Sequence, residues 1–177
     1  MSGVLKAILD RFTCRDFLPD PLSKDQVVSL VDAALASPSA MNLQPWHIIA
    51  VTDKTLIDEM DRYAMSDKTK PYHERIMERG GKMFYGAPCA IFIAINDSDH
   101  APLDAGIVSQ NVSLAAFSMG LGSCICGMMR IPLENPGFYA RVGIPQGMKF
   151  GMSVLVGRVR TAKAPHELDR SKVTFLQ

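Results

Sequence analysis

The sequence predicts a single domain in which helices cover a β-sheet, an α/β or α+β sandwich. Short apolar runs typical of strands alternate with longer segments of helical periodicity. The chain has 177 residues, which is enough for one domain with a sizeable core. Its hydrophobic content of 47% and charged content of 21% are those of an ordinary globular protein.

The N-terminal part is expected to contain two helices and an extended segment. Residues 3–9 place apolar side chains on one helical face, whereas residues 11–17 alternate between two faces and are expected to be extended. A second helix should begin after Ser23, which forms a capping box with Gln26. It has to end before Pro38, because proline cannot continue it.

The next segment predicts a strand followed by two helices. Residues 46–51 are expected to form a buried strand in which His47 is a core histidine. Asp53 should cap a helix that runs to about residue 64. Residues 65–82 are the most polar part of the chain and predict a short helix that is more insertion than core.

The second half predicts a long central helix between strands. Residues 89–95 read as a buried strand, and residues 101–119 as a helix that is apolar nearly all round. Such a helix belongs in the middle of the fold or at a subunit interface. Gly120 is its expected C-cap, and residues 121–125 a short strand.

The C-terminal part predicts a short helix, one strong strand and a tail. The short helix is expected to reach Val142, and residues 152–159 form the strand. The tail after Pro165 is expected to act as a minor strand. Residues 163–177 have little core of their own and are therefore interpreted as an arm that docks on a neighbour or on another subunit.

Charge and sequence patterns exclude several classes of partner. The formal net charge is +1, which gives no electrostatic case for binding nucleic acid or an anionic membrane. No apolar segment is long enough to span a bilayer, and the N-terminus lacks the pattern of a secretory signal. The four histidines show no metal-ligand spacing, so no metal site is expected. We therefore expect a cytoplasmic protein.

The four cysteines leave two interpretations open. Cys124 and Cys126 would point the same way in an extended segment, so a redox pair is conceivable. Buried thiols in a reducing compartment are the favoured interpretation, because no Cys-x-x-Cys motif is present.

Two cationic segments are candidate phosphate sites. Arg11, Thr13 and Arg15 would share one face of an extended segment, and guanidinium groups with a hydroxyl are suited to binding a phosphate. The alternative is a solvated edge strand whose arginines pair with nearby aspartates. The tail sequence Arg170-Ser171-Lys172 repeats the pattern of cation, hydroxyl and cation, although a charged tail is usually just solvated.

Two further segments suggest contact with a ligand. Residues 37–46 form a polar joint bracketed by prolines, which would suit the border of a planar ligand or a plain helix-to-strand loop. The glycines of residues 120–127 would let backbone N–H groups approach a ligand, or would simply end a helix before an edge strand. No conspicuous acid/base set is present, which suggests that a cofactor carries the chemistry.

Three motifs, matching in order and spacing, resemble those of the nitroreductase family of FMN-dependent oxidoreductases. Residues 11–17 resemble its motif Arg-x-Ser/Thr-x-Arg/Lys-x-Phe, and residues 37–46 its more specific motif Pro-Ser-x-x-Asn-x-Gln-Pro-Trp. Residues 104–122 resemble the central helix and its exit. Residues 170–172 resemble the final phosphate-binding pair, so that the resemblance covers nearly the whole chain.

The resemblance implies a fold and an assembly. The fold is an α/β/α sandwich of the α+β class with a mixed, mainly antiparallel central sheet. One FMN-binding domain spans residues 1–177, and the arm of residues 163–177 docks on the partner subunit. The assembly is an intertwined homodimer with two FMN sites at the interface, each built from both subunits.

The resemblance also implies the residues of the FMN site. One subunit provides the phosphate and ribityl contacts, Arg15 at the pyrimidine end of the ring, and the backbone near N5. The partner provides the loop that borders the ring, and Lys82 is a further ring contact by a loose alignment. The implied FMN-binding residues are Arg11, Phe12, Thr13, Arg15, Pro38, Ser39, Ala40, Asn42, Lys82, Cys126, Gly127, Arg170 and Lys172.

The implied activity is a two-electron oxidoreduction in which the flavin carries the chemistry and no side chain is a dedicated catalyst. NADH or NADPH would donate a hydride to flavin N5, and a nitroaromatic, quinone or similar acceptor would then take the electrons in a ping-pong cycle. Alternatives on the same scaffold are reductive dehalogenation, flavin breakdown or FMN storage without turnover. The chain departs from the family in its shortness, in the small insertion at residues 65–82 and in Cys126, where some members carry a glutamate.

Overall fold

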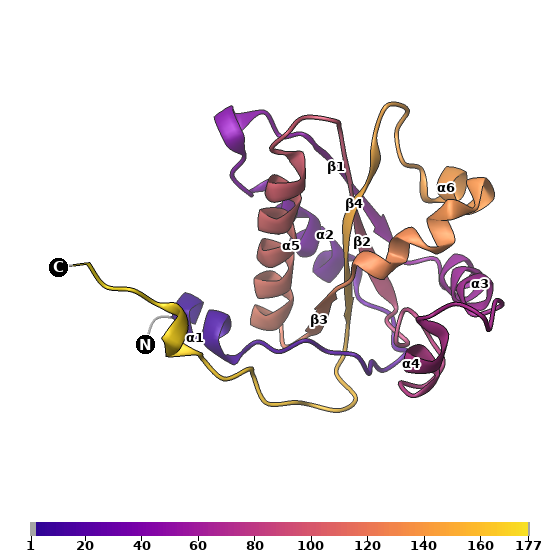
Figure 1. Ribbon diagram of the computed structural model, residues 1–177, viewed down its shortest axis with the longest axis horizontal. Helices are drawn as coiled ribbons and strands as arrows, with labels where there is room; N and C mark the ends of the chain where they lie inside the picture. Colours follow the sequence, from indigo (N-terminus) through magenta and orange to yellow (C-terminus); the bar gives the residue numbers. More distant parts are fainter. Residues whose placement is uncertain (1–2, 177) are drawn as a thin grey trace.

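The computed structural model describes residues 3–176 and shows three layers, with a central β-sheet between two layers of helices (Figure 1). The sheet contains β1 (Trp46–Val51), β2 (Cys89–Ile95), β4 (Lys149–Gly157) and β3 (Gly122–Ile125), in that spatial order. All three pairings between these strands are antiparallel. The predicted α+β sandwich with a mainly antiparallel sheet is confirmed.

One face of the sheet is covered by α2 (Lys24–Leu35) and α5 (Ala101–Ser118), with α1 (Gly3–Asp10) beyond them at one end of α5. The opposite face carries α3 (Lys54–Ala64), α4 (His73–Met77) and α6 (Pro136–Val142). Short 3-10 helices lie at η1 (Ala40–Asn42), η2 (Gly127–Arg130), η3 (Pro132–Glu134) and η4 (Arg170–Lys172).

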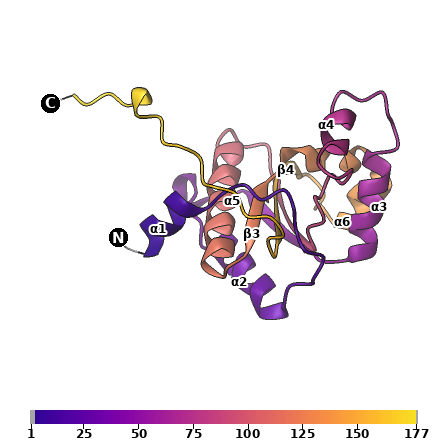
Figure 2. The same cartoon turned by 90° about the horizontal axis from the view of Figure 1, so that it is seen from below.

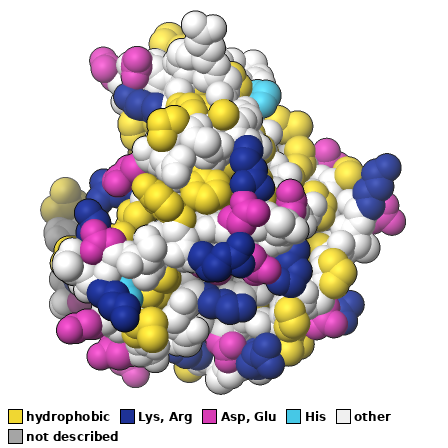
Figure 3. Space-filling model, turned by 90° about the vertical axis from the view of Figure 1, so that its right-hand side faces the viewer, with side chains coloured by type: hydrophobic (Ala, Val, Ile, Leu, Met, Phe, Trp, Pro, Cys, Tyr) yellow, Lys and Arg dark blue, Asp and Glu magenta, His cyan; other side chains and the backbone are white. Residues whose placement is uncertain are grey.

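Strand β2 lies inside the sheet, and all of its residues are buried. Because side chains alternate along a strand, Ile91 and Ile93 pack with α2 and α5 while Phe92 and Ala94 pack with α3. The molecule therefore has two apolar cores, one on each side of the sheet. Lysine, arginine and acidic side chains are intermingled on the face shown in Figure 3, as the small net charge predicts.

The predicted caps are confirmed. Ser23 and Gln26 form the reciprocal hydrogen bonds of a capping box, and Asp53 accepts from the backbone N–H groups of Thr55 and Leu56. The long helix ends at Ser118 with Met119 as its C-cap, and the left-handed Gly120, with φ of 72°, follows as the first residue beyond the cap.

Three predictions about the strands are corrected. Strand β1 is an edge strand with exposed residues, and His47 is one of them, because no strand within residues 3–176 covers the outer side of β1. Strand β4 begins at Lys149, three residues earlier than expected, because its N-terminal end pairs with β2. The tail after Pro165 forms no strand within the described residues. Its residues are exposed and lack the edge partner that a strand requires.

Candidate functional site

The segment of residues 11–17 is fixed by two isolated bridges, one from Thr13 to Ser123 on the open edge of β3 and one from Phe17 to Val159 just beyond β4. Thr13 pairs with Ser123 in parallel, and the Cys14 N–H donates to the Ser123 carbonyl at 2.9 Å. Glycine at position 122 permits this approach, since a Cβ there would lie 2.9 Å from that of Cys14. The predicted extended segment is thus present as two bridges rather than as a regular strand.

The side chains of this segment line a hollow of about 230 Å³. Phe12 shares this lining with the arginines, although strict alternation predicted the opposite face. Two tail residues that sequence reasoning missed, Lys163 and His166, join them there. The lining residues are Arg11, Phe12, Thr13, Arg15, Lys163, Ala164 and His166.

The cations of this hollow are available for an anion. Neither Arg11 nor Arg15 forms an ion pair within residues 3–176. The nearby carboxylate of Asp16 is instead held by Arg160 at 3.2 Å and by the Thr161 hydroxyl at 2.7 Å. The alternative in which the arginines pair with neighbouring aspartates is therefore not observed. Unpaired guanidinium groups beside a hydroxyl are suited to binding a phosphate.

The joint of residues 37–46 is a tight, mostly exposed loop. Ser39 Oγ accepts from the Gln44 N–H at 2.9 Å, and the Ala40 N–H donates to Asp104 Oδ1 at 3.3 Å. Met41, Asn42 and Gln44 are left-handed, with φ of 51°, 55° and 46°. Such a conformation is unfavourable for these residues and persists where the surroundings impose it. The surroundings of this loop therefore hold its backbone in one defined conformation.

Asp104 is the buried anchor of this loop. It is 2% exposed and lies in the first turn of α5. Its Oδ2 atom is buried without a hydrogen-bond partner among the described residues. A buried carboxylate oxygen in that state is costly, so the position calls for a functional explanation.

These two regions lie at opposite ends of α5 (Figure 1). Asp104 binds the loop at the N-terminal end of the helix, whereas Ser123 follows its C-terminal end and holds the Arg11 segment. A helix of 18 residues is about 27 Å long at roughly 1.5 Å per residue. One chain therefore separates the two groups of predicted FMN-binding residues by most of a helix length.

Cys126 and Gly127 directly follow β3, beside Ser153 in the middle of β4. Cys126 is buried, and its backbone is fixed to Ser153: the Cys126 N–H donates to the Ser153 carbonyl at 2.8 Å, and the Ser153 hydroxyl donates to the Cys126 carbonyl at 2.7 Å. Gly127 lines a separate open hollow of about 590 Å³, to which Arg75 and Arg130 also contribute.

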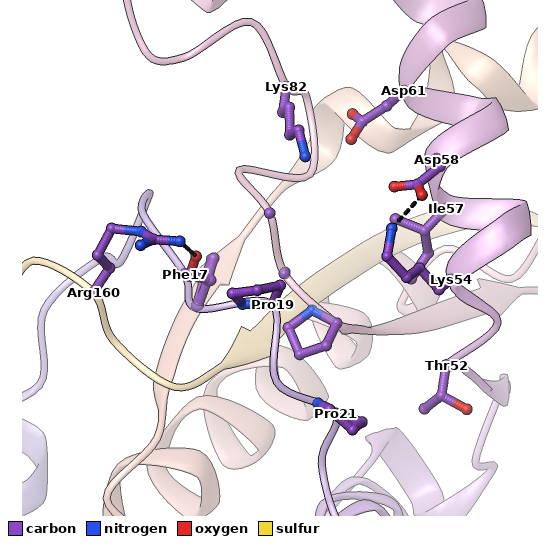
Figure 4. A pocket seen from close by; sticks show the side chains of 13 residues that line it. Phe17, Pro19, Pro21, Thr52, Lys54, Ile57, Asp58, Asp61, Lys82 and Arg160 are labelled. Carbon is purple, nitrogen blue, oxygen red and sulfur yellow. Dashed lines mark hydrogen bonds and ion pairs between the residues drawn. The ribbon is translucent and has the colours of Figure 1, made fainter.

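Lys82 does not line the hollow of Arg11. It lies with Asp61 at a cavity of about 300 Å³, walled by Phe17 and several prolines (Figure 4). Asp61 Oδ1 accepts from the Phe84 N–H at 2.9 Å. Burial raises the pKa of Asp61 to about 6, against the opposing effects of backbone N–H groups and Lys82. The structure thus places Lys82 apart from the other predicted site residues.

The tail carries Arg170 and Lys172 away from the body of the chain (Figures 1 and 2). Both residues lie in η4, where the Asp169 carboxylate accepts from the Ser171 N–H at 3.1 Å. Residues 160–176 are all exposed. The structure therefore does not bring Arg170 and Lys172 together with Arg11 in one chain.

The described residues offer neither a metal-binding cluster nor a helix that could cross a membrane. No cluster of three or more histidine, cysteine or acidic side chains within residues 3–176 has the geometry to hold a metal ion. None of the helices in this part of the chain is long and apolar enough to cross a membrane.

Comparisons with known proteins agree on one family. A model described as the nitroreductase family matches residues 8–158. A protein of Methanothermobacter thermautotrophicus, provisionally named an NADH dehydrogenase/NAD(P)H nitroreductase, is 31% identical over 137 residues, which span 75% of this chain and 63% of that protein. The chain thus spans somewhat less than two thirds of this relative's length.

Two solved structures resemble the chain over nearly its whole length. A nitroreductase with bound FMN from Desulfitobacterium hafniense is 37% identical, with a TM-score of 0.93 and complete coverage of both chains. An FMN-dependent nitroreductase from Clostridium difficile is 28% identical, with a TM-score of 0.81 and 98% coverage of each chain.

Proposed function

Because the chain belongs to the nitroreductase family, we propose that it is an FMN-dependent NAD(P)H oxidoreductase that passes two electrons to a nitroaromatic, quinone or similar small acceptor in a ping-pong cycle. The observation that carries the proposal is the hollow in which Arg11, Thr13 and Arg15 meet without acidic partners. FMN, when bound, supplies the centre that takes up and releases electrons.

The donor groups of this hollow fit the phosphate end of FMN. Arg11 and Thr13 provide guanidinium and hydroxyl donors for phosphate oxygens, and Lys163 adds positive charge. Arg170 and Lys172 would complete the enclosure when the tail lies against a dimer. Arg15 would hold negative charge at the pyrimidine end of the ring. Lys82 stays outside this proposal, because it lines another cavity.

The remainder of the site would come from a second copy of the chain. Pro38, Ser39, Ala40 and Asn42 would border the ring from the partner, since a single chain holds this loop at the far end of α5. The backbone of Cys126 and Gly127 would face the ring from the first subunit. The proposal therefore places each FMN site between two chains of a homodimer.

The surface of α5 supports a homodimer. One face of the helix packs on the sheet, while Leu103 is 68% exposed and Ile107, Leu114 and Phe117 are half-buried on the other side. These side chains follow helical spacing and form an apolar stripe. The exposed tail of residues 160–176 would then gain a surface on which to pack.

The chain's own residues would act by positioning. The ion-paired and hydrogen-bonded groups around the hollow fix its shape, and none of the lining side chains is a carboxylic acid. Binding and orientation of the nicotinamide and the acceptor over one ring face would therefore account for the protein's contribution. Four free cysteines further suit the reducing cytoplasm, where we place the protein.

An anaerobic titration tests the activity. Purified protein should be yellow, and NADH or NADPH should bleach it in the absence of oxygen. A nitroaromatic or quinone added afterwards should restore the colour, with parallel lines in a double-reciprocal plot of turnover. Bleaching no faster than that of free FMN would reject the enzyme in favour of a storage protein, and failure to take up FMN would reject the site.

A further inference from the structure

The open hollow of about 590 Å³ beside Gly127 is lined by two positive charges and by no acidic side chain. The charges belong to Arg75, on α4, and Arg130, at the end of η2. Neither arginine forms an ion pair with a carboxylate within residues 3–176. Their positive charge is therefore not neutralised by the chain itself, and the hollow attracts anions.

The guanidinium group of Arg75 lies close to the backbone that the proposed function places near the flavin ring. Arg75 Nη2 is 3.9 Å from Met128 Sδ, and Met128 directly follows Gly127. The helix that carries Arg75 is fixed from below, because Ile76 is fully buried in the core and the Tyr72 hydroxyl donates to the Ala64 carbonyl at 3.3 Å. The polar segment of residues 65–82 thus brings a cation to the side of Gly127.

The uncharged side chains of the hollow are apolar or aromatic and pack on the buried core. These residues are Tyr72, Met128, Ile131 and Phe150. The Phe150 ring is held edge-on against the buried ring of Phe92, with 6.2 Å between the ring centroids. Apolar and aromatic walls bind flat rings, and a guanidinium group beside them binds a carboxylate through two parallel hydrogen bonds.

We propose that Arg75 and Arg130 bind the acidic group of aromatic electron acceptors, so that the enzyme prefers acceptors that carry a carboxylate or sulfonate to neutral ones. This inference rests on the proposed function and names its class of acceptor. The acidic group itself does not react. When the acceptor is a nitroaromatic, the nitro group loses one oxygen as water and becomes a nitroso group, while NAD(P)H and a proton are consumed and NAD(P)⁺ is released.

The phosphate groups of the nicotinamide donor have the same chemistry as an acidic acceptor, and guanidinium groups bind them equally well. The two sources differ in the half of the cycle that they affect. Arginines that bind the acceptor influence reoxidation of the protein, whereas arginines that bind the donor influence bleaching by NADH or NADPH. The experiments therefore measure both halves.

Equilibrium binding tests the proposal without turnover. Benzoate and benzamide have the same ring, differ in charge and lack a nitro group, and ligand-observed NMR titration of the oxidised, FMN-loaded protein measures the Kd of each. Benzoate should bind roughly tenfold more tightly than benzamide, and added salt should weaken benzoate binding alone. Equal Kd values for the two compounds would overturn the proposal.

The variant Arg75→Gln/Arg130→Gln assigns this preference to the two arginines. Both side chains are exposed, so the variant should fold as the parent does. Its Kd for benzoate should rise to about that for benzamide. Arg62→Gln removes an exposed arginine of α3 that does not line the hollow, and this control should keep the parent's preference. A preference that survives in the double variant, or that is lost in the control, would overturn the proposal.

Acceptor kinetics with 4-nitrobenzoate and 4-nitrobenzamide complete the test. The ratio of their kcat/KM values should favour 4-nitrobenzoate by roughly tenfold in the parent and approach one in the double variant. Slower bleaching of the double variant by NADH or NADPH, with an unchanged acceptor ratio, would assign the arginines to the donor and overturn the proposal. Reduction of neither compound would reject the proposed function, whereas equal reduction of both by the parent would reject only the acceptor preference.

Discussion

The two loops at opposite ends of α5 are built in different ways for the same proposed ligand. At one end, the segment of residues 11–15 has extended backbone held by bridges and presents charged side chains. At the other end, the loop of residues 38–44 is nearly free of charge and holds its shape through left-handed residues and the Asp104 anchor.

This difference separates two kinds of recognition. A cationic side chain contributes through long-range attraction and direct hydrogen bonds, so its loss should weaken binding and leave the fold intact. A loop shaped by its backbone contributes through its conformation, so loss of an anchor should first cost stability. Substitutions in the two regions should therefore differ in what they change.

The largest effect is expected from removing both arginines of the cationic end. Each charged hydrogen bond contributes roughly 1.5–3 kcal/mol, so Arg11→Ala/Arg15→Ala should weaken FMN binding by roughly 3–6 kcal/mol, or at least 100-fold. Fluorescence titration of the apoprotein measures this change, and the melting temperature should stay near that of the parent. Arg62→Ala, an exposed arginine on α3, is the control. FMN affinity that falls equally in both proteins would contradict the role of Arg11 and Arg15 in binding FMN.

Substitution of Asp61 tests whether a buried carboxylate outside the two loops affects FMN binding as well as stability. Its pKa is raised in the folded state from 3.8 to about 6, so the folded protein binds the extra proton between these values, and ionisation costs stability above pH 6. Between pH 4 and pH 8, the unfolding free energy of Asp61→Asn should therefore rise relative to the parent by up to about 3 kcal/mol. Denaturant titrations at the two pH values measure this shift.

FMN affinity is the second measurement on Asp61→Asn, and it distinguishes this cavity from the proposed FMN site. Asp61 lines the same cavity as Lys82 and accepts a hydrogen bond from the Phe84 N–H. Phe84 belongs neither to the segment of residues 11–15 nor to the loop of residues 38–44. FMN affinity of Asp61→Asn should consequently equal that of the parent. A loss of affinity would mean that this cavity belongs to the cofactor site after all.

At the uncharged end, Asp104→Ala should leave the Ala40 N–H without its acceptor. An unsatisfied buried group costs about 1–3 kcal/mol, so we expect a loss of about 2 kcal/mol in the unfolding free energy. Asp104→Asn keeps an acceptor oxygen and should lose less. FMN binding by Asp104→Ala should fall severalfold with unchanged salt dependence, unlike the arginine variants. A stability equal to that of the parent would show that the loop does not need this anchor.

The smallest effect is expected for Ser39→Ala. It removes the hydroxyl that accepts from the Gln44 N–H, which is an exposed bond worth about 1 kcal/mol. Denaturant titration should show a loss of this size. Ser23→Ala, which removes a helix cap of similar strength, is a matched control that should leave FMN binding unchanged.

The local elements were predictable because their signals are local. The capping box at Ser23 and the cap at Asp53 begin helices where the sequence indicated, and β1 and β2 occupy the predicted residues. His47 was misplaced because alternation alone does not reveal that β1 is an edge strand. The prediction of a strand in the tail was wrong for a similar reason, because a strand needs a neighbouring strand and the sequence does not show whether one is present.

The site was only partly predictable from sequence. The motifs identified Arg11, Thr13, Arg15 and the loop of residues 37–46 as candidates, but Lys163 and His166 were missed. Their signal lies in topology, because β4 neighbours β3 and the chain leaving β4 passes the segment that is bridged to Ser123. Lys82 was assigned by a loose alignment, and the structure places it in another cavity. Whether residues from distant segments meet in one site depends on the packing of the elements that carry them, which the sequence motifs do not give.

The claim that two chains share each FMN site can be tested with mixed dimers. Arg11→Ala removes the phosphate clamp, and Ala40→Trp blocks the loop, so each homodimer should retain little FMN. In a mixed dimer, isolated with two different affinity tags, one site carries both substitutions and the other carries neither. We predict one FMN per mixed dimer, measured by absorbance after release. Mixed dimers that hold no more FMN than their parents would contradict a shared site.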